Sequence, residues 1–381
     1  MAIILTGSTG VATPAVVDAS GGNTATINSM TPTADSLQGF RNRIINGDMR
    51  IDQRNAGASV TPAAPNQYTV DRWKADISVS SKYSAQKSST APTGFVNSLL
   101  ITSLSAYTAG SAERFCMTQN IEGLNVPDLA WGTANAKTIT LSFWVRSSLT
   151  GTFGGVISNS AQNRSYPFTY TISSANTFEQ KTITITGDTS GTWLRTSGIG
   201  LRVIWGLGVG STLSTTAGAW AAGEYYSATG ATSVVGTNGA TLYITGVQLE
   251  VGSVATPFER RDYGRELIMC YRYYYRIVSG ADDPFGMAYC IATTATNGMI
   301  QFPVTMRVSP SALEQNGTAS DYRVRHGGSS TNCSSVPTFG DSSPSAARIA
   351  FSVASGLTLG QGALMSSSVN GNVYLGFSSE L

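Results

Sequence analysis

Strict alternation of apolar and polar residues over short runs is the feature that most limits the folds open to this chain. One run, residues 138–146, places apolar side chains at every second position, namely Ile139, Leu141, Phe143 and Val145. Residues 201–207 repeat the pattern with Leu201, Val203, Trp205 and Leu207. Because successive side chains of a strand point to opposite faces, a period of two predicts half-buried strands, with Trp205 in the core.

Similar short runs recur along the middle of the chain, with turn residues between them. They span residues 68–76, 95–104, 114–119, 166–172, 178–186 and 241–251. Residues 43–51 are expected to form a short strand that leads into an Asn-Gly turn. Many strands at short spacing indicate a two-sheet antiparallel sandwich, so the fold class is all-β.

The chain is expected to have three parts. Residues 1–41 have no sustained period and are predicted to be an extended segment, and residues 42–261 form the sandwich. Residues 262–381 carry further strand-like runs and are predicted to be a smaller β-sandwich-like domain. Residues 264–277 are the one helix-like or extended junction, and the later runs span residues 288–292, 299–304, 348–353 and 373–377.

Composition excludes several function classes. Lys and Arg total 24 against 22 Asp and Glu, so no broad nucleic-acid-binding face is expected. No apolar run approaches the ~20 residues of a membrane helix, so no membrane insertion is expected. The opening residues also lack the pattern of a secretory signal. Four widely spaced cysteines and a single histidine give neither a zinc site nor a disulfide scaffold.

No residue set in the sequence indicates catalysis. Glycines near residue 208 lack the spacing and the strand–helix context of a nucleotide loop. Asp282 and Asp283 are adjacent in sequence, whereas the two carboxylates of a glycosidase face each other across a cleft. We therefore expect a non-enzymatic protein.

Trp144 and Arg146 are the candidate glycan-binding residues. They alternate with the apolar row of residues 139–145 and so should point away from the core. An aromatic ring can stack on a sugar while a neighbouring polar group binds its hydroxyls. Packing of Trp144 under a loop or against another subunit remains an open alternative.

The run of residues 271–276 is rich in tyrosine and arginine. Tyr271, Tyr274 and Tyr275 are the candidates for an assembly interface, because tyrosine and arginine are enriched in interface cores. Packing of the same residues between two β-domains is compatible with this interpretation.

Several segments resemble bacteriophage tail fibres and other virion appendage proteins. Residues 42–54 and 68–73 resemble the start of a module common in such proteins, and residues 245–252 and 255–261 resemble its end. Residues 266–274 resemble the join to a C-terminal tip domain. The middle also resembles a jelly roll of the carbohydrate-binding-module type.

That resemblance has implications for metal binding and assembly. It implies Asp48 and Glu250 as candidate ligands of a structural calcium, although a hard cation takes ~6–8 oxygen ligands. No other cofactor is expected. Residues 7–10 and 21–26 resemble the attachment segments of phage fibre and collar proteins, so residues 1–41 are expected to dock on other virion proteins. The resemblance also implies assembly as a homo-oligomer, namely a homotrimer.

The resulting expectation is a structural virion appendage protein, a phage tail fibre that adheres to host-surface glycan. It would be assembled in the bacterial cytoplasm and reside in the tail, collar or head of the virion. A head or collar fibre or decoration protein without receptor binding is an alternative. A glycan depolymerase is another, although such enzymes commonly show long β-helical repeats that this chain lacks. A secreted carbohydrate-binding module is the last.

Overall fold

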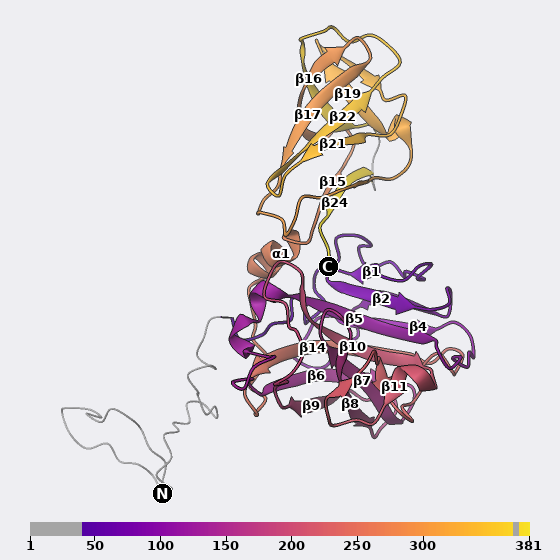
Figure 1. Cartoon of the computed structure of the whole chain (residues 1–381). Helices are drawn as coiled ribbons and strands as arrows, with labels where there is room; N and C mark the ends of the chain where they lie inside the picture. Colours follow the sequence, from indigo (N-terminus) through magenta and orange to yellow (C-terminus); the bar gives the residue numbers. More distant parts are fainter. Residues whose placement is uncertain (1–39, 369–372) are drawn as a thin grey trace, which may run out of the picture.

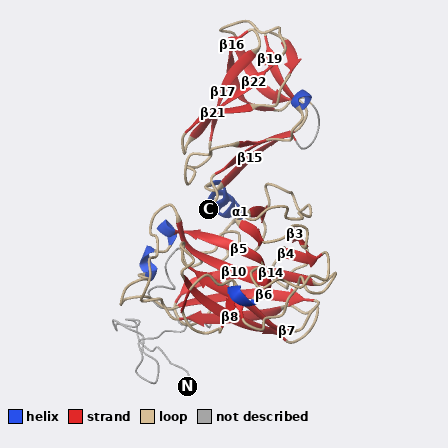
Figure 2. Cartoon of the chain, turned by 45° about the vertical axis from the view of Figure 1, so that its right-hand side comes forward, coloured by secondary structure: helices blue, strands red, loops and turns tan. Residues whose placement is uncertain are grey.

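The computed structural model describes residues 40–368 and 373–381, in which nearly all regular structure is β-strand. The all-β class predicted from the sequence is confirmed. Strands β1 to β14 form a sandwich domain, and strands β15 to β24 form a smaller C-terminal domain that stands on it (Figure 1). Figure 2 shows that strands dominate both domains. The predicted attachment segment, residues 1–41, lies almost entirely outside the described residues.

Two antiparallel sheets form the sandwich domain. The seven-stranded sheet has the order β1 (Gln67–Val70), β2 (Trp73–Ile77), β5 (Arg114–Glu122), β10 (Ile199–Val209), β7 (Gly151–Ser158), β8 (Arg164–Ile172) and β12 (Ala221–Ala222). The five-stranded sheet has the order β3 (Tyr83–Ser88), β4 (Ser98–Ser103), β14 (Thr241–Val251), β6 (Ile139–Ser147) and β9 (Glu179–Ile185). A short parallel pair, β11 (Ser214–Thr215) and β13 (Ser227–Ala228), lies over the seven-stranded sheet. Three 3₁₀ turns span Gly123–Asn125, Pro127–Leu129 and Ser211–Leu213.

The core between the two sheets is built from the alternating rows. All four apolar residues of the β6 row are fully buried, and so is Trp205 on β10, as the sequence predicts. The Trp205 ring centroid lies 5.3 Å from that of Trp73 and 5.7 Å from that of Phe143. The large rings from both sheets therefore interdigitate, which is how a sandwich fills a core about 10 Å thick.

Residues 43–51 do not form the predicted strand. The segment is a series of bends and turns held by buried side-chain amides. The Asn42 side chain accepts from the Leu249 backbone N–H and donates to the Val247 carbonyl. Asn46, at a φ of 57°, bonds both polar groups of Ile51. Side chains thus form hydrogen bonds with backbone groups that would pair with a neighbouring strand if the segment lay in a sheet.

Strand β7 was not among the predicted runs, and it contains three glycines. The structure explains their presence by close packing. A Cβ at Gly155 would lie 2.4 Å from the Ile204 carbonyl oxygen, and one at Gly154 would lie 2.4 Å from Ser227 Oγ. Both glycines permit neighbouring groups to approach the strand, which is a recognised use of glycine inside a sheet.

The C-terminal domain has its own buried cluster of apolar side chains, which runs from Phe285 to Phe377. Its main sheet has the order β20 (Ser329–Asn332), β19 (Tyr322–His326), β23 (Gly362–Ser367), β16 (Pro284–Ala292), β17 (Ala295–Gln301), β22 (Ala346–Ser352) and β21 (Thr338–Ser342). A second sheet has the order β15 (Tyr274–Ser279), β24 (Val373–Ser378) and β18 (Leu313–Glu314), and a 3₁₀ turn spans Ala319–Asp321. Among the helices of the described ranges, none has the length and apolarity that a bilayer crossing requires.

Helix α1 (Tyr263–Tyr271) begins the connection between the two domains. Asp262 caps it by accepting from the Arg265 N–H. The helix ends at Tyr271 and strand β15 begins at Tyr274, so the predicted junction is a helix followed by a strand.

Buried charges join the domains where β24 returns to the sandwich. Glu380 forms ion pairs with Arg72 and Arg54, whose side chains are 1% and 12% exposed. Arg72 also lies over the Tyr273 ring, with its Cζ 3.5 Å from the ring centroid. Arg307 donates to the carbonyls of Ser379 and Glu380 and to that of Ser197 in the sandwich. The strand that leaves the C-terminal domain is therefore fixed to the sandwich.

Replacing Glu380 tests this junction. Glu380→Gln leaves the buried Arg72 guanidinium without its counter-charge, so the free energy of unfolding should fall by about 3–5 kcal/mol. Denaturant unfolding of the full chain measures the change. Asp341→Asn is the control, because Asp341 pairs with Arg348 at an exposed site and should contribute little. Equal, small effects of both variants would contradict a structural role for the junction.

Candidate functional site

Trp144 and Arg146 lie on the outer face of the five-stranded sheet, opposite the core row. Arg146 pairs in register with Tyr243 on β14, and Trp144 pairs with Thr245 on β14 and with Gln180 on β9. The Arg146 Cζ lies 5.1 Å from the Tyr243 ring centroid and 5.9 Å from that of Phe178. The structure thus brings the two predicted residues together on one half-buried face.

Local packing already occupies part of the Trp144 ring. A bulge in β14 places Gly246 at a φ of 58°. A Cβ at Gly246 would lie 3.1 Å from Trp144 Cδ1 and 2.6 Å from Phe95, so both rings close on this glycine. Phe95 in turn meets Phe258 edge to face, with centroids 5.2 Å apart. Trp144 therefore offers a partial surface rather than an open stacking platform.

Trp144 and Trp205 should differ in stability when truncated. Trp205→Ala should lower the free energy of unfolding by about 3–5 kcal/mol, because the ring is fully buried between the sheets. Trp144→Ala should cost roughly 1–2 kcal/mol, because only part of that ring is packed. Thermal and denaturant unfolding measure both values. Equal losses would show that Trp144 acts purely in packing.

The carboxylates of Asp48 and Glu250 each interact with hydrogen-bond donors of the protein, and the two sets of donors differ. Asp48 Oδ2 lies 2.6 Å from Arg50 Nε. The Glu250 carboxylate accepts from Gln248 Nε2, from the Thr256 N–H and from Thr256 Oγ1. Within residues 40–368 and 373–381 no group of three or more His, Cys, Asp or Glu side chains could hold a metal. The donor set around these two carboxylates does not fit calcium, which needs oxygen ligands rather than N–H groups.

The three tyrosines predicted for assembly lie near the join between the domains. Tyr274 is fully buried within its own chain, and its hydroxyl donates to Glu314. Tyr271 and Tyr275 are half-buried and meet edge to face, with centroids 5.1 Å apart. Tyr274 has no surface to offer a second chain, so an interface here would rest on Tyr271 and Tyr275.

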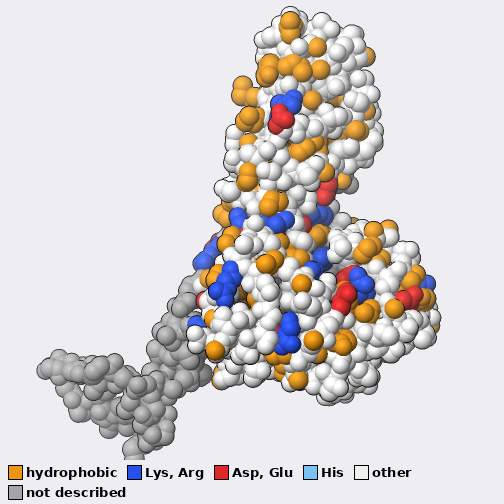
Figure 3. Space-filling view, viewed as in Figure 1, with side chains coloured by type: hydrophobic (Ala, Val, Ile, Leu, Met, Phe, Trp, Pro, Cys, Tyr) orange, Lys and Arg blue, Asp and Glu red, His pale blue; other side chains and the backbone are white. Residues whose placement is uncertain are grey.

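An open surface lies on the outer face of the C-terminal sheet, and we call it the tip face. It is a row across five strands: Arg325 on β19, Leu364 on β23, Met287 on β16, Met299 on β17 and Arg348 on β22. Arg325 pairs with Leu364, Leu364 pairs with Met287, and Met299 pairs with Arg348. Met287 and Met299 are 79% and 60% exposed. Figure 3 shows hydrophobic side chains gathered over these strands.

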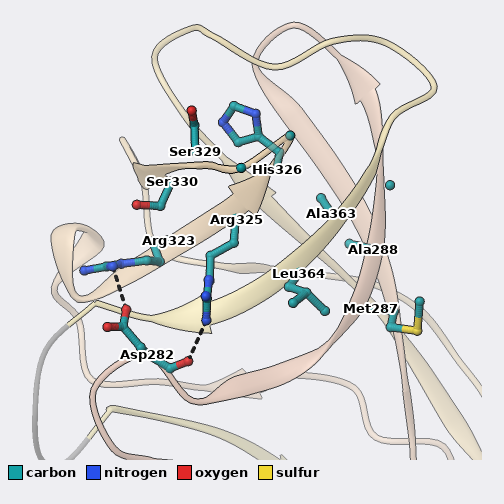
Figure 4. A pocket seen from close by; sticks show the side chains of 13 residues that line it. Asp282, Met287, Ala288, Arg323, Arg325, His326, Ser329, Ser330, Ala363 and Leu364 are labelled. Carbon is teal, nitrogen blue, oxygen red and sulfur yellow. Dashed lines mark hydrogen bonds and ion pairs between the residues drawn. The ribbon is translucent and has the colours of Figure 1, made fainter.

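Two adjoining hollows mark the tip face. The larger, of about 670 Å³, is lined by the β19–β20 hairpin and by β16 and β23 (Figure 4). In it Arg323 forms an ion pair with Asp282 at 2.6 Å, and Arg325 donates to the Asp282 carbonyl at 3.2 Å. His326, at the rim, has its Nε2 3.1 Å from Thr331 Oγ1. The hollow therefore presents guanidinium, hydroxyl and backbone groups.

The smaller hollow, of about 400 Å³, shares Met287 and Ala288 with the larger one. Tyr289, Asn297, Met299 and Arg348 complete its lining. Tyr289 is 55% exposed and pairs across the sheet with Asn297 and with Gly362, which has no side chain. An aromatic ring thus stands beside an amide and a guanidinium, a combination that can stack on and hydrogen-bond a ligand.

The sequence analysis did not find the tip face. A signal was present in strand β16, where Met287, Tyr289 and Ile291 alternate with Ala288 and Cys290. Both faces of this strand are apolar, although the sheet is covered on only one side. Such a pattern indicates either two covered faces or an exposed binding surface.

Comparison with known proteins gives only distant similarities to solved structures. No protein-family model and no curated protein sequence matches the chain. Part of the chain is similar to the enzymatically active domain of tailspike protein 4 of bacteriophage CBA120, at 11% identity and a TM-score of 0.31. That match covers 55% of this chain and 21% of the tailspike chain, so it spans about a fifth of the tailspike structure.

Two further solved structures have names that refer to sugar binding. One is a putative sugar-binding protein from Bacteroides thetaiotaomicron, at 13% identity and a TM-score of 0.34, with 56% of this chain and 100% of that chain covered. The other is a family 11 carbohydrate-binding module from Clostridium thermocellum, at 10% identity and a TM-score of 0.27, with 53% and 100% covered. At these identities and TM-scores the similarities support no conclusion about the fold or the ligands of this chain.

Proposed function

We propose that this chain is a non-enzymatic virion appendage protein, a tail fibre, that binds host-surface glycan through its tip face. The observation that carries the proposal is the pair of adjoining hollows around the exposed Tyr289, Met287 and Arg325. Sugars are bound by such mixtures of groups, since a ring stacks on their C–H faces while polar groups bind their hydroxyls. The resemblance of residues 42–54 and 245–261 to phage appendage proteins supports the virion role.

The position of the tip face suits adhesion. The C-terminal domain projects from the sandwich, and the tip face lies on the outer face of its main sheet (Figures 1 and 3). The buried Glu380–Arg72 pair and the Arg307 bonds fix the orientation of this domain. A binding surface on a rigid, projecting domain reaches a host surface without the entropy cost of ordering on contact.

A binding role is favoured over catalysis by the charges in the larger hollow. Among the described residues that line it, Asp282 is the one carboxylate, and Arg323 already neutralises it. Glycoside hydrolysis requires two carboxyl groups on opposite sides of the scissile bond. A decoration protein without receptor binding is the second candidate, and the same binding assay separates the two.

Tyr289→Ala should weaken binding at least about tenfold, because it removes the stacking surface of the smaller hollow. Its melting temperature should hardly change, because the ring is 55% exposed. The measurement is binding of fluorescently labelled protein to an array of bacterial capsular polysaccharides and lipopolysaccharides. Tyr263→Ala on α1 is the matched control, since Tyr263 is 54% exposed and lies away from the tip face.

Two outcomes of this assay would change the assignment. If Trp144→Ala abolishes binding and Tyr289→Ala does not, the outer face of the five-stranded sheet is the site. If the wild-type protein binds no polysaccharide on the array, the adhesion proposal fails and the decoration role replaces it.

Assembly is tested separately. We propose a homotrimer, which would present three tip faces and could raise avidity by roughly 10²–10⁴ over a single site. Light scattering on the purified full chain should give three times the mass of one chain at micromolar concentration. A single-chain mass would contradict the trimer without affecting the tip face.

A further inference from the structure

Two cations, Lys74 and Arg202, lie on the outer face of the seven-stranded sheet. Lys74 on β2 is 4% exposed, and its Nζ donates to the Asn66 side-chain oxygen at 2.8 Å. Arg202 on β10 is half-buried, and its Nη2 donates to the Ser160 carbonyl at 3.0 Å. Within the described part of the chain neither cation forms an ion pair. Charges this deeply placed are normally paired with an opposite charge.

Strand β5 runs between the two cations and shares their face. Lys74 pairs with Thr118, and Arg202 pairs with Asn120 two residues further along β5. Directly paired residues of an antiparallel sheet project from the same side. On the other flank of Arg202, Ser158 of β7 is its register partner. The two cations therefore border a small patch of hydroxyl and amide side chains.

Several polar atoms of this patch are buried and lack a hydrogen-bond partner among the described residues: Thr118 Oγ1, Asn120 Oδ1, Ser158 Oγ and Arg202 Nε. Thr118, Asn120 and Ser158 are at most 2% exposed. A buried polar group without a partner costs about 1–3 kcal/mol, so such groups rarely cluster without a function. Three of the four atoms can donate a hydrogen bond, as can Lys74 Nζ.

The positive charges of Lys74 and Arg202 also repel each other. Burial, and then the positive charge of Arg202, lower the pKa of Lys74 to about 8. Asp76 and Glu380 act in the opposite direction on Lys74, but they are bound to other arginines: Asp76 to Arg114, and Glu380 to Arg72 and Arg54. Near Arg202, burial lowers the pKa of the guanidinium, and Asp76 and Glu224 act in the opposite direction; the Glu224 carboxylate accepts from the Tyr226 hydroxyl. An anion between Lys74 and Arg202 would therefore meet two cations that form no ion pair with any described residue.

We propose that Lys74 and Arg202 form a binding site for a tetrahedral oxyanion, a phosphate or sulfate group. The guanidinium of Arg202 offers a fork of donors suited to such an ion, and Lys74 adds a point charge. Thr118 and Ser158 add hydroxyl donors beside the cations. The four oxygens of a phosphate or sulfate can accept hydrogen bonds from more of these donors than the two oxygens of a carboxylate can. The half-buried Arg202 side is the route of access, because Lys74 is nearly enclosed.

Phosphorus NMR with the full chain tests the site directly. Adding protein to inorganic phosphate at constant ionic strength should broaden or shift the phosphate resonance. A phosphorylated hexose serves as the second probe and separates a free ion from a sugar-borne group. If only the inorganic ion responds, the site takes a free anion; if both respond, it takes a glycan phosphate as well.

Variants distinguish this site from general salt effects. Lys74→Met and Arg202→Gln should each lose the phosphate response by at least about tenfold, and Lys181→Met should keep it. Lys181 is the matched control, since it pairs with Glu179 on the opposite sheet. Circular dichroism confirms folding, and the half-buried Arg202 variant remains informative if Lys74→Met does not fold.

A stability measurement gives a second readout. Above the dissociation constant, each tenfold increase in phosphate should raise the melting temperature of the wild-type chain by about 3–5 °C more than that of either variant. Without phosphate, Lys74→Met should be at least as stable as the wild type, because it removes the repulsion between two like charges. Identical phosphate responses in the wild-type and variant chains would overturn the proposal.

Discussion

The ion pairs of Glu380 with Arg72 and Arg54 are the contact on which the relation of the two domains depends. Taking charges out of water costs several kcal/mol per ion, and only close pairing and further hydrogen bonds offset that cost. Here Tyr273 lies under Arg72, and the Asn120 carbonyl accepts from the same guanidinium. Because these partners come from both domains, the charges are stable only when the domains meet in one arrangement. The direction in which the tip face points follows from this contact.

Much of the sandwich could be predicted because one face of its strands packs into a continuous apolar core. The alternation at Ile139–Val145 and Leu201–Leu207 shows which side chains face the core, and the apolar side chains of both rows are fully buried. The prediction failed where other interactions took the place of the backbone hydrogen bonds between strands. Residues 43–51 look like a strand but are held by the Asn42 and Asn46 amides, whose partners near residue 248 or at Asp71 are not evident from local sequence. In β7 the glycines serve tight packing, which sequence alone cannot separate from a turn.

The candidate sites were harder to predict, for a related reason. Alternation correctly placed Trp144 and Arg146 opposite the core, but it could not show that the Phe95 and Trp144 rings both pack against Gly246. The tip face depends on register between five strands that are far apart in sequence, from Met287 to Leu364. Lys74 and Arg202 become neighbours only because β5 lies between β2 and β10. Each of these arrangements arises from contacts between strands that are far apart in the sequence, and a local sequence pattern does not show such contacts.

The pairing of β15 with β24 has a mechanical consequence. β15 enters the C-terminal domain from helix α1, and β24 leaves it toward the sandwich, and the two strands pair over their whole length. A pull on the C-terminal domain is therefore divided between the covalent connection through α1 and the non-covalent contacts that Glu380 and Leu381 make with the sandwich. Twisting of the domain about a single linker is blocked for the same reason. Tension applied at the tip face would pass into the sandwich through both strands at once, and separation would require the Glu380 ion pairs and the Arg307 bonds to break together.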